Sequence, residues 1–390
     1  MYSIFKININ PQRVYGLDIL RALAILFVML GHSKGFYPEA AQPTVAYLTF
    51  EGVSIFFVLS GYLIGHILIK NLLDQTENKK TLINFWMRRW LRTLPNYFLI
   101  FFVLLVVHIL YKENFNPWNK GPYLIFSQNL FTHKHFFFTE AWSISIEEWF
   151  YLLIPLILYL MVRVFKLRVL PTLFWLSFLV IVTVTLFRLY RFYEIPIPDI
   201  NQWDIHFRRQ VSTRLDSIMF GVLAGALQIW YSSFWLKYKN LFFSVGVLIL
   251  IVHQITQPFL TNNFGMYSCV FSFSVNSIGV MFILPFLSEI KTGKGKMFQF
   301  FSYISLISYS LYLVNYTLVN CCIIQKIPWD SIFENKIWIA FLQPASFWLI
   351  SIFISVLLYK YFELPIMNLR DRIGKNRKEL YSSKINTPRI

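Results

Sequence analysis

The sequence predicts an all-α polytopic integral membrane protein, a helical bundle with about ten transmembrane helices. Of its 390 residues, 56% are apolar and only 14% are charged, whereas soluble domains average about 45–50% and about 25%. The apolar residues form runs of roughly 20, the length that a membrane-spanning helix needs. Strands of a transmembrane barrel instead alternate apolar and polar residues over about 10 positions. The composition therefore excludes soluble and disordered proteins, and the length of the runs disfavours a barrel.

The apolar runs divide the chain into ten predicted spans joined by short loops. In order, they are 15–35, 47–69, 93–111, 142–163, 170–190, 210–231, 240–260, 267–288, 301–324 and 337–360. The spans form one membrane domain over residues 1–365, and a basic polar tail follows over 366–390. We expect this tail to be cytoplasmic.

The distribution of positive charge orients these spans. The two chain ends and the connections that follow even-numbered spans hold about two thirds of the 36 lysine and arginine residues, and such residues concentrate on the cytoplasmic side. Both termini are therefore predicted to be cytoplasmic. This topology explains the net charge of +17, so the expected partner is a lipid bilayer and no nucleic acid. The sequence does not indicate an oligomeric state.

The three cysteines are too few for a disulfide framework, and no zinc-like spacing surrounds them. Cys269, Cys321 and Cys322 lie in or beside apolar segments. They are interpreted as small core residues, and no metal site is predicted.

Charged residues in the first span are the first functional signal, because a charge within a spanning helix is energetically expensive. Arg21 and His32 are eleven positions apart, which puts them on one helix face, ~16 Å apart along the axis. This spacing suggests one elongated site crossing much of the bilayer. In the alternative interpretation, Arg21 pairs with Asp18 and His32 caps the helix.

Three arginines precede the third span, in the sequence FWMRRWLRTLP. Arg89 and Arg92 fall on one helix face, Arg88 lies beside them, and guanidinium groups suit bidentate binding of phosphate. We expect them to hold the phosphates of a donor. Ordinary positive charge at the cytoplasmic surface is the alternative.

Polar residues of later spans extend the candidate site. Ser60 and Tyr62 of the second span are assigned to the donor site, although helix packing is the favoured role of its small residues Ser60, Gly61 and Gly65. Glu147 and Glu148 open the fourth span, and since adjacent helical residues face directions 100° apart, at most one of them faces a narrow site. That carboxylate is expected to orient His32. Candidate acceptor-binding residues are Trp142, Arg214, Asp216, Tyr312 and Asn315; for Arg214 and Asp216 a structural ion pair is the alternative.

In this order, these motifs resemble the bacterial membrane acyltransferase family three, whose members O-acylate cell-surface sugars. The resemblance rests on Arg21 and His32, FFVLSGYLI (56–64), Arg89 and Arg92, WSISIEEWFYL (142–152), RLDSIMFGVLAG (214–225), SYSLYLVN (308–315) and YFELP (361–365). One departure is Val314-Asn315, where the family usually has a histidine.

The resemblance implies an enzyme of the bacterial inner (plasma) membrane that uses acetyl-CoA as acyl donor and a surface or lipid-linked carbohydrate as acceptor. The imidazole of His32 then acts as general base, since it titrates near neutral pH, or carries the acyl group covalently. Arg21, Arg89 and Arg92 correspond to the family's arginines. A second function remains open: transport or flipping of an anionic sugar or lipid.

Overall fold

The computed structural model describes residues 7, 13–73, 80–111, 115–131, 137–261 and 264–369, and within these ranges every regular element is a helix. The predicted spans correspond to α1 (Tyr15–Ser33), α3 (Gly52–Leu73), α4 (Lys80–Tyr111), α6 (Ala141–Tyr159), α7 (Val169–Glu194), α9 (Val211–Trp230), α11 (Lys239–Thr261), α12 (Ser272–Leu287), α13 (Gly295–Val314) and α15 (Lys336–Leu358). Residues 370–390 of the predicted tail lie outside the described ranges.

Shorter elements connect or extend the long helices. They are η1 (Lys34–Phe36), α2 (Gln42–Leu48), η2 (Pro117–Lys120), α5 (Gly121–Leu124), η3 (Leu160–Val164), α8 (Ile200–Trp203), η4 (Asp204–Arg208), α10 (Ser232–Lys237), η5 (Tyr267–Phe271), η6 (Asn315–Cys321), η7 (Ile324–Lys326), α14 (Trp329–Ile332) and η8 (Tyr359–Glu363). Of these, η6 is a π-helical segment that continues α13.

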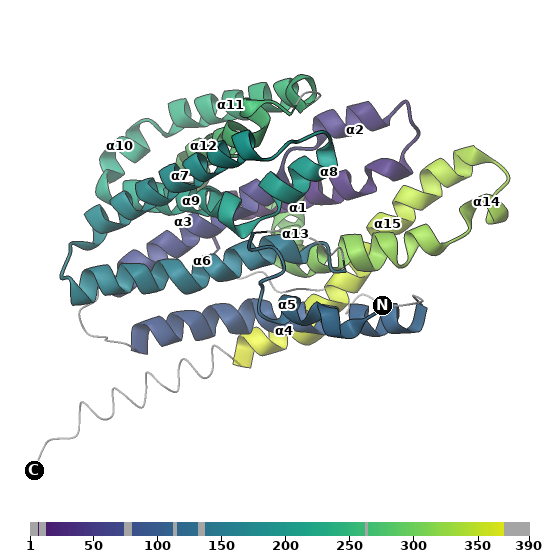
Figure 1. Cartoon of the computed structure of the whole chain (residues 1–390), viewed down its shortest axis with the longest axis horizontal. Helices are drawn as coiled ribbons and strands as arrows, with labels where there is room; N and C mark the ends of the chain where they lie inside the picture. The colour runs from purple at the N-terminus through teal and green to yellow at the C-terminus, as the bar shows by residue number, and fades with distance from the viewer. Residues whose placement is uncertain are drawn as a thin grey trace, which may run out of the picture.

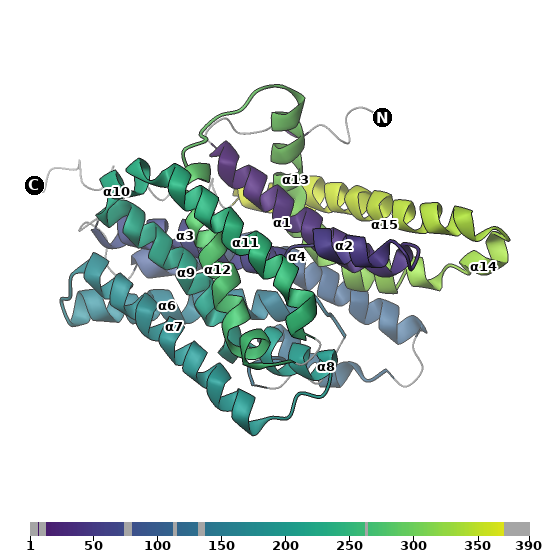
Figure 2. The same ribbon diagram turned by 90° about the horizontal axis from the view of Figure 1, so that it is seen from above.

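The long helices lie side by side as one bundle, with α11 at the upper edge and α4 at the lower edge of Figure 1. In Figure 2, α14 and α15 reach outward beside α2. Nine helices in the described part are long and apolar enough to cross a membrane, which confirms the predicted polytopic helical bundle.

The helix at the remaining predicted span, α9, is more polar because it carries Arg214, Asp216 and Gln228. It lies inside the bundle, where α3, α6, α7 and α12 pack around it (Figure 1). A charged helix in this place meets protein side chains and is shielded from lipid.

Glycines let α3 and α9 approach with their backbones in contact. A Cβ atom added to Gly61 would lie 1.9 Å from the carbonyl oxygen of Ile218, and one added to Gly221 would lie 1.9 Å from that of Val58. Small residues at helix interfaces permit this approach. The expected packing role of the small residues in the second span is therefore confirmed at Gly61.

Two hydrogen bonds hold helix ends that are predicted to be cytoplasmic. The N–H of Gly16, at the start of α1, donates to the carbonyl of Ile290 just after α12 (2.9 Å). Asn96 of α4 donates to the Glu363 carboxylate of η8 (2.9 Å). The start of α1, the end of α12 and the end of α15 are all predicted to face the cytoplasm.

The close contact of α3 and α9 makes the bundle sensitive to one methyl group at Gly61. We expect Gly61→Ala to lower the free energy of unfolding by about 1–3 kcal/mol, because overpacking pushes the helices apart. Gly121→Ala is the control, since nothing lies within 4 Å of the added Cβ. Denaturation of both variants in detergent measures the difference, and equal midpoints would contradict the packing argument.

Candidate functional site

A cavity opens between α1, α3, α4, α6 and α13. Three guanidinium groups line it, those of Arg21, Arg89 and Arg92, together with Glu147 and Ser60. The structure thus brings together four residues that the sequence assigned to the donor site, Arg21, Ser60, Arg89 and Arg92, and adds Glu147, which was expected to orient His32.

Arg21 is held in place by two neighbours. Its Nη1 lies 3.4 Å from the Asp18 carboxylate and donates to Ser305 Oγ at 3.3 Å. Arg13 also pairs with Asp18. Arg21 therefore forms the expected i,i+3 contact and lines the cavity at the same time.

The paired carboxylates of the fourth span face different ways, as their 100° offset predicts. Glu147 lines the cavity and accepts a hydrogen bond from Tyr151 (2.9 Å), whose hydroxyl also contacts Ser60 Oγ (2.7 Å). Glu148 is buried and accepts a hydrogen bond from Thr93 (2.9 Å). Only Glu147 is available to a molecule in the cavity.

Two residues assigned to the donor site lie outside this cavity. Arg88 is exposed on α4 and does not line the cavity. Tyr62 is buried and donates to Gln228 of α9 (2.5 Å). Tyr62 thus lies in the contact between α3 and α9, and the geometry does not support a donor contact for either residue.

At the opposite end of α1, His32 is held by residues of η6. Its Nδ1 forms a hydrogen bond with Oδ1 of Asn315. The Tyr316 ring lies against the imidazole at 4.6 Å between centroids, and Asn320 donates to the His32 carbonyl (2.6 Å). The expectation that Glu147 or Glu148 orients His32 is wrong in this structure, since the partner of the ring is an amide on another helix.

The amide orientation of Asn315 fixes the proton on His32. Asn315 Nδ2 donates to the carbonyls of Leu311 (2.8 Å) and Tyr312 (2.9 Å), so the amide oxygen faces the imidazole. Because an amide oxygen only accepts, Nδ1 of His32 carries the hydrogen and Nε2 keeps its lone pair. This tautomer suits a base that acts through Nε2.

Tyr312 connects the cavity to the His32 region. Its ring lines the cavity and its hydroxyl contacts Ser143 Oγ (2.7 Å), while its carbonyl holds Asn315. The cavity lining does not include His32. One helical turn thus separates the end of the cavity from the partner of the imidazole.

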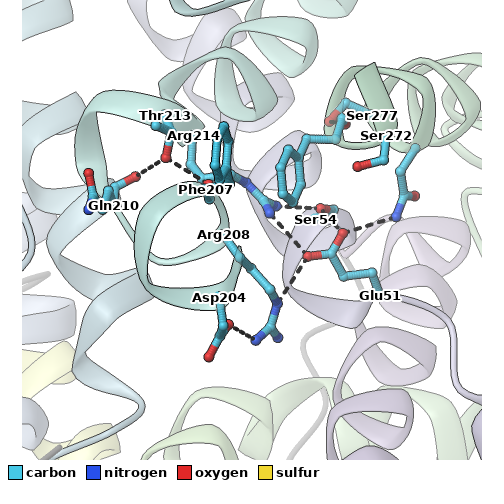
Figure 3. A network of polar contacts seen from close by, with 12 residues as sticks. Glu51, Ser54, Asp204, Phe207, Arg208, Gln210, Thr213, Arg214, Ser272 and Ser277 are labelled. Atoms are coloured by element: carbon cyan, nitrogen blue, oxygen red, sulfur yellow. Dashed lines mark hydrogen bonds and ion pairs between the residues drawn. The ribbon is translucent and has the colours of Figure 1, made fainter. Parts of the chain in front are cut away.

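Figure 3 shows a network of charges that includes Arg208, whose positive charge acts electrostatically on His32. Arg208 and Arg214 both point toward Glu51, at 3.7 Å and 3.2 Å. Ser54 and Asn276 also bond to this carboxylate. Glu51 therefore ties α3 to η4, α9 and α12.

Asp204 anchors two arginines, one within η4 and one directly after it. It pairs with Arg208 (2.9 Å) and Arg209 (2.5 Å). Burial by itself raises the pKa of Asp204, but these two guanidinium groups outweigh it and hold the pKa below its usual value. Asp204 is therefore a stable anion at neutral pH.

The remaining acceptor candidates are buried. Arg214 and Asp216 have no exposed surface, and Asp216 forms an ion pair with Arg188 of α7 (2.7 Å). These contacts support the structural alternative and speak against an acceptor contact for this pair. Trp142 is also buried, and Arg208 lies over its ring at 5.2 Å.

The sequence interpretation missed the residues that organise the His32 region: Glu140, Asp204, Arg208, Tyr316 and Asn320. Glu140 lies two residues before Trp142, the first residue of WSISIEEWFYL, but no periodicity marks it. No group of three or more potential metal ligands occurs among the described residues.

Comparisons with known proteins agree with this architecture. A family model described as an acyltransferase domain matches residues 14–360. O-acetyltransferase OatA of Staphylococcus aureus (strain NCTC 8325 / PS 47) is 31% identical over 182 residues, which cover 43% of this chain and 28% of that protein. A protein of S. aureus strain COL, named as a candidate O-acetyltransferase, is 28% identical over 331 residues, 78% of this chain and 50% of that protein.

The chain spans about half or less of the length of these curated relatives. No solved structure matches it. Since the family model covers nearly the whole chain, this multi-pass membrane protein belongs to the acyltransferase family that the model describes.

Proposed function

We propose that this protein is an O-acyltransferase that moves an acetyl group from cytoplasmic acetyl-CoA to a hydroxyl of a cell-surface or lipid-linked carbohydrate. The bacterial inner membrane is its proposed location. The observation that carries the proposal is the arrangement of α1, which contributes Arg21 to an arginine-lined cavity at one end and His32 at the other.

The cavity suits the donor's anionic end. Arg21, Arg89 and Arg92 supply three guanidinium groups, whose planar geometry matches phosphate oxygens. The spacing from Arg21 to His32 is ~16 Å along the helix axis, comparable to an extended pantetheine arm. A phosphate end held by the arginines therefore allows the thioester to approach His32.

His32 would act as general base toward the acceptor. In this step Nε2 takes the proton of the sugar hydroxyl while the hydroxyl oxygen attacks the thioester carbonyl carbon. The C–O bond forms, the C–S bond breaks, and the coenzyme A thiolate leaves and takes a proton from the imidazolium. The Asn315 amide keeps the Nδ1 hydrogen in place and stabilises the charged ring.

A covalent route uses the same atoms in two steps. Nε2 attacks the thioester carbonyl carbon, the C–S bond breaks and the coenzyme A thiolate leaves an acyl-imidazolium. The acceptor hydroxyl then takes the acyl group, His32 returns to its neutral form, and the hydroxyl proton is released to the thiolate or to water. A radiolabelled acyl group bound to His32, in protein incubated with labelled acetyl-CoA and no acceptor, distinguishes this route from direct transfer.

Removing the imidazole tests the catalytic role of His32. We expect His32→Ala to lower acetyl transfer by about 10²–10⁴-fold, the usual contribution of a general base, with unchanged binding of acetyl-CoA. The assay follows label from radiolabelled acetyl-CoA into envelope carbohydrate in membrane vesicles. Normal transfer by His32→Ala at equal membrane level would exclude this role.

The arginine pair is tested by donor affinity. Charge-assisted hydrogen bonds contribute about 1.5–3 kcal/mol each, so Arg89→Ala with Arg92→Ala should weaken acetyl-CoA binding by at least about tenfold. Titration calorimetry of the detergent-purified protein measures this change.

Arg88→Ala is the matched control, because Arg88 lies on the same helix outside the cavity lining. An equal loss in this control would mean that only the general positive charge matters. A folded wild-type protein with no affinity for acetyl-CoA would instead favour transport of an anionic sugar or lipid.

A further inference from the structure

We propose that Glu140 is a positioning residue for His32. Its carboxylate fixes the start of η6, the segment that holds the imidazole. This inference rests on the proposed role of His32 and adds a residue that touches neither donor nor acceptor in that mechanism.

The Glu140 side chain is almost completely buried, with 2% of the residue exposed. It lies directly before α6 and points to η6. One carboxylate oxygen accepts the backbone N–H groups of Tyr316 (3.0 Å) and Thr317 (2.7 Å), and the other accepts the Thr317 hydroxyl. All three hydrogen bonds thus go to two successive residues.

These hydrogen bonds come at the point where α13 changes to π-helical geometry. The α-helix ends at Val314 and the π segment runs over Asn315–Cys321. Single π turns inside α-helices are rare in proteins, and those that occur often lie at functional sites. Buried N–H groups require acceptors, and Glu140 supplies one for two of them at the start of this segment.

Two further contacts join the loop before α6 to the same helix. The Thr139 N–H donates to Thr317 Oγ1 (3.1 Å), and the Tyr312 hydroxyl lies 3.3 Å from the Glu140 carbonyl. Backbone and side-chain groups of residues 139 and 140 therefore clamp α13 and η6 on both sides of Asn315.

The clamped segment makes every described hydrogen bond to His32 that comes from another element. Asn315 bonds to the ring, Tyr316 lies against it, and Asn320 bonds to the His32 carbonyl. Tyr316 is therefore held through its backbone by Glu140 while its ring contacts the imidazole. A shift of η6 would move Asn315 Oδ1 away from Nδ1 of His32. The hydrogen would then no longer be held on Nδ1, and Nε2 would no longer be kept free to act as a base.

A double-mutant cycle tests this coupling. We expect Glu140→Gln to lower the rate of acetyl transfer at saturating acetyl-CoA by about tenfold or more, with unchanged KM and Kd for acetyl-CoA, because the arginines lie elsewhere. Combined with Asn315→Ala, the loss should be smaller than the product of the two single losses, since both act on His32.

Glu363→Gln is the matched control for the cycle. Glu363 is a buried carboxylate that accepts hydrogen bonds from Ser310 of α13 (2.6 Å) and from Asn96. Its contact on α13, Ser310, precedes Tyr312 in the chain and so lies on the side away from η6. In the double variant Glu363→Gln with Asn315→Ala, the loss of transfer rate should equal the product of the two single losses. If the double variant Glu140→Gln with Asn315→Ala also lost activity by the full product of the two single losses, the proposal would be overturned.

A readout independent of activity separates this proposal from the proposed function. Nitrogen chemical shifts of His32, assigned among seven histidines with a His32→Gln variant, report which ring nitrogen carries hydrogen. Glu140→Gln should shift them toward the Asn315→Ala values, and Thr317→Val should shift them less. Unchanged shifts in folded Glu140→Gln would overturn the positioning role, whereas wild-type protein without acyl transfer would overturn only the proposed function.

Discussion

The contact of α3 with α9 is the constraint on which the rest of the bundle depends. At Gly61 and Gly221 no side chain separates the two backbones. Within the membrane the hydrophobic effect does not favour one apolar helix contact over lipid, so close packing and hydrogen bonds must hold helices together. The approach encloses α9, and enclosure allows this helix to carry charge.

The charges on α9 in turn tie its neighbours together. Arg214 bonds to Glu51 and Ser54 of the α3 region, and Asp216 bonds to Arg188 of α7. Removing one partner of such a pair leaves a buried, uncompensated charge, which typically lowers the free energy of unfolding by about 3–5 kcal/mol. These pairs therefore fix the rotation of α9 about its axis relative to α3 and α7.

The first helix carries two different chemistries at its two ends. Arg21 lies among cationic groups that suit an anionic ligand, whereas His32 is held by neutral amides and an aromatic ring. The separation follows from helix geometry, because both residues share one face and α13 runs along it. Tyr312 and Asn315, one turn apart on this chain segment, link the two ends, and the segment's geometry at Asn315 decides what the imidazole meets.

The sequence by itself determined the helical membrane class, the positions of the spans and the cavity arginines, since hydropathy and helical spacing are local properties of the chain. It also required that only one of Glu147 and Glu148 face the site. Which one does so depends on the rotation of α6 against α4. The partner of His32 is Asn315, far along the chain, and its approach depends on the π turn of η6 and on Glu140. Arg214 and Asp216 lie in ion pairs because α3 and α7 bring Glu51 and Arg188 to them. Such pairs are decided by how helices pack, and no local pattern encodes that packing.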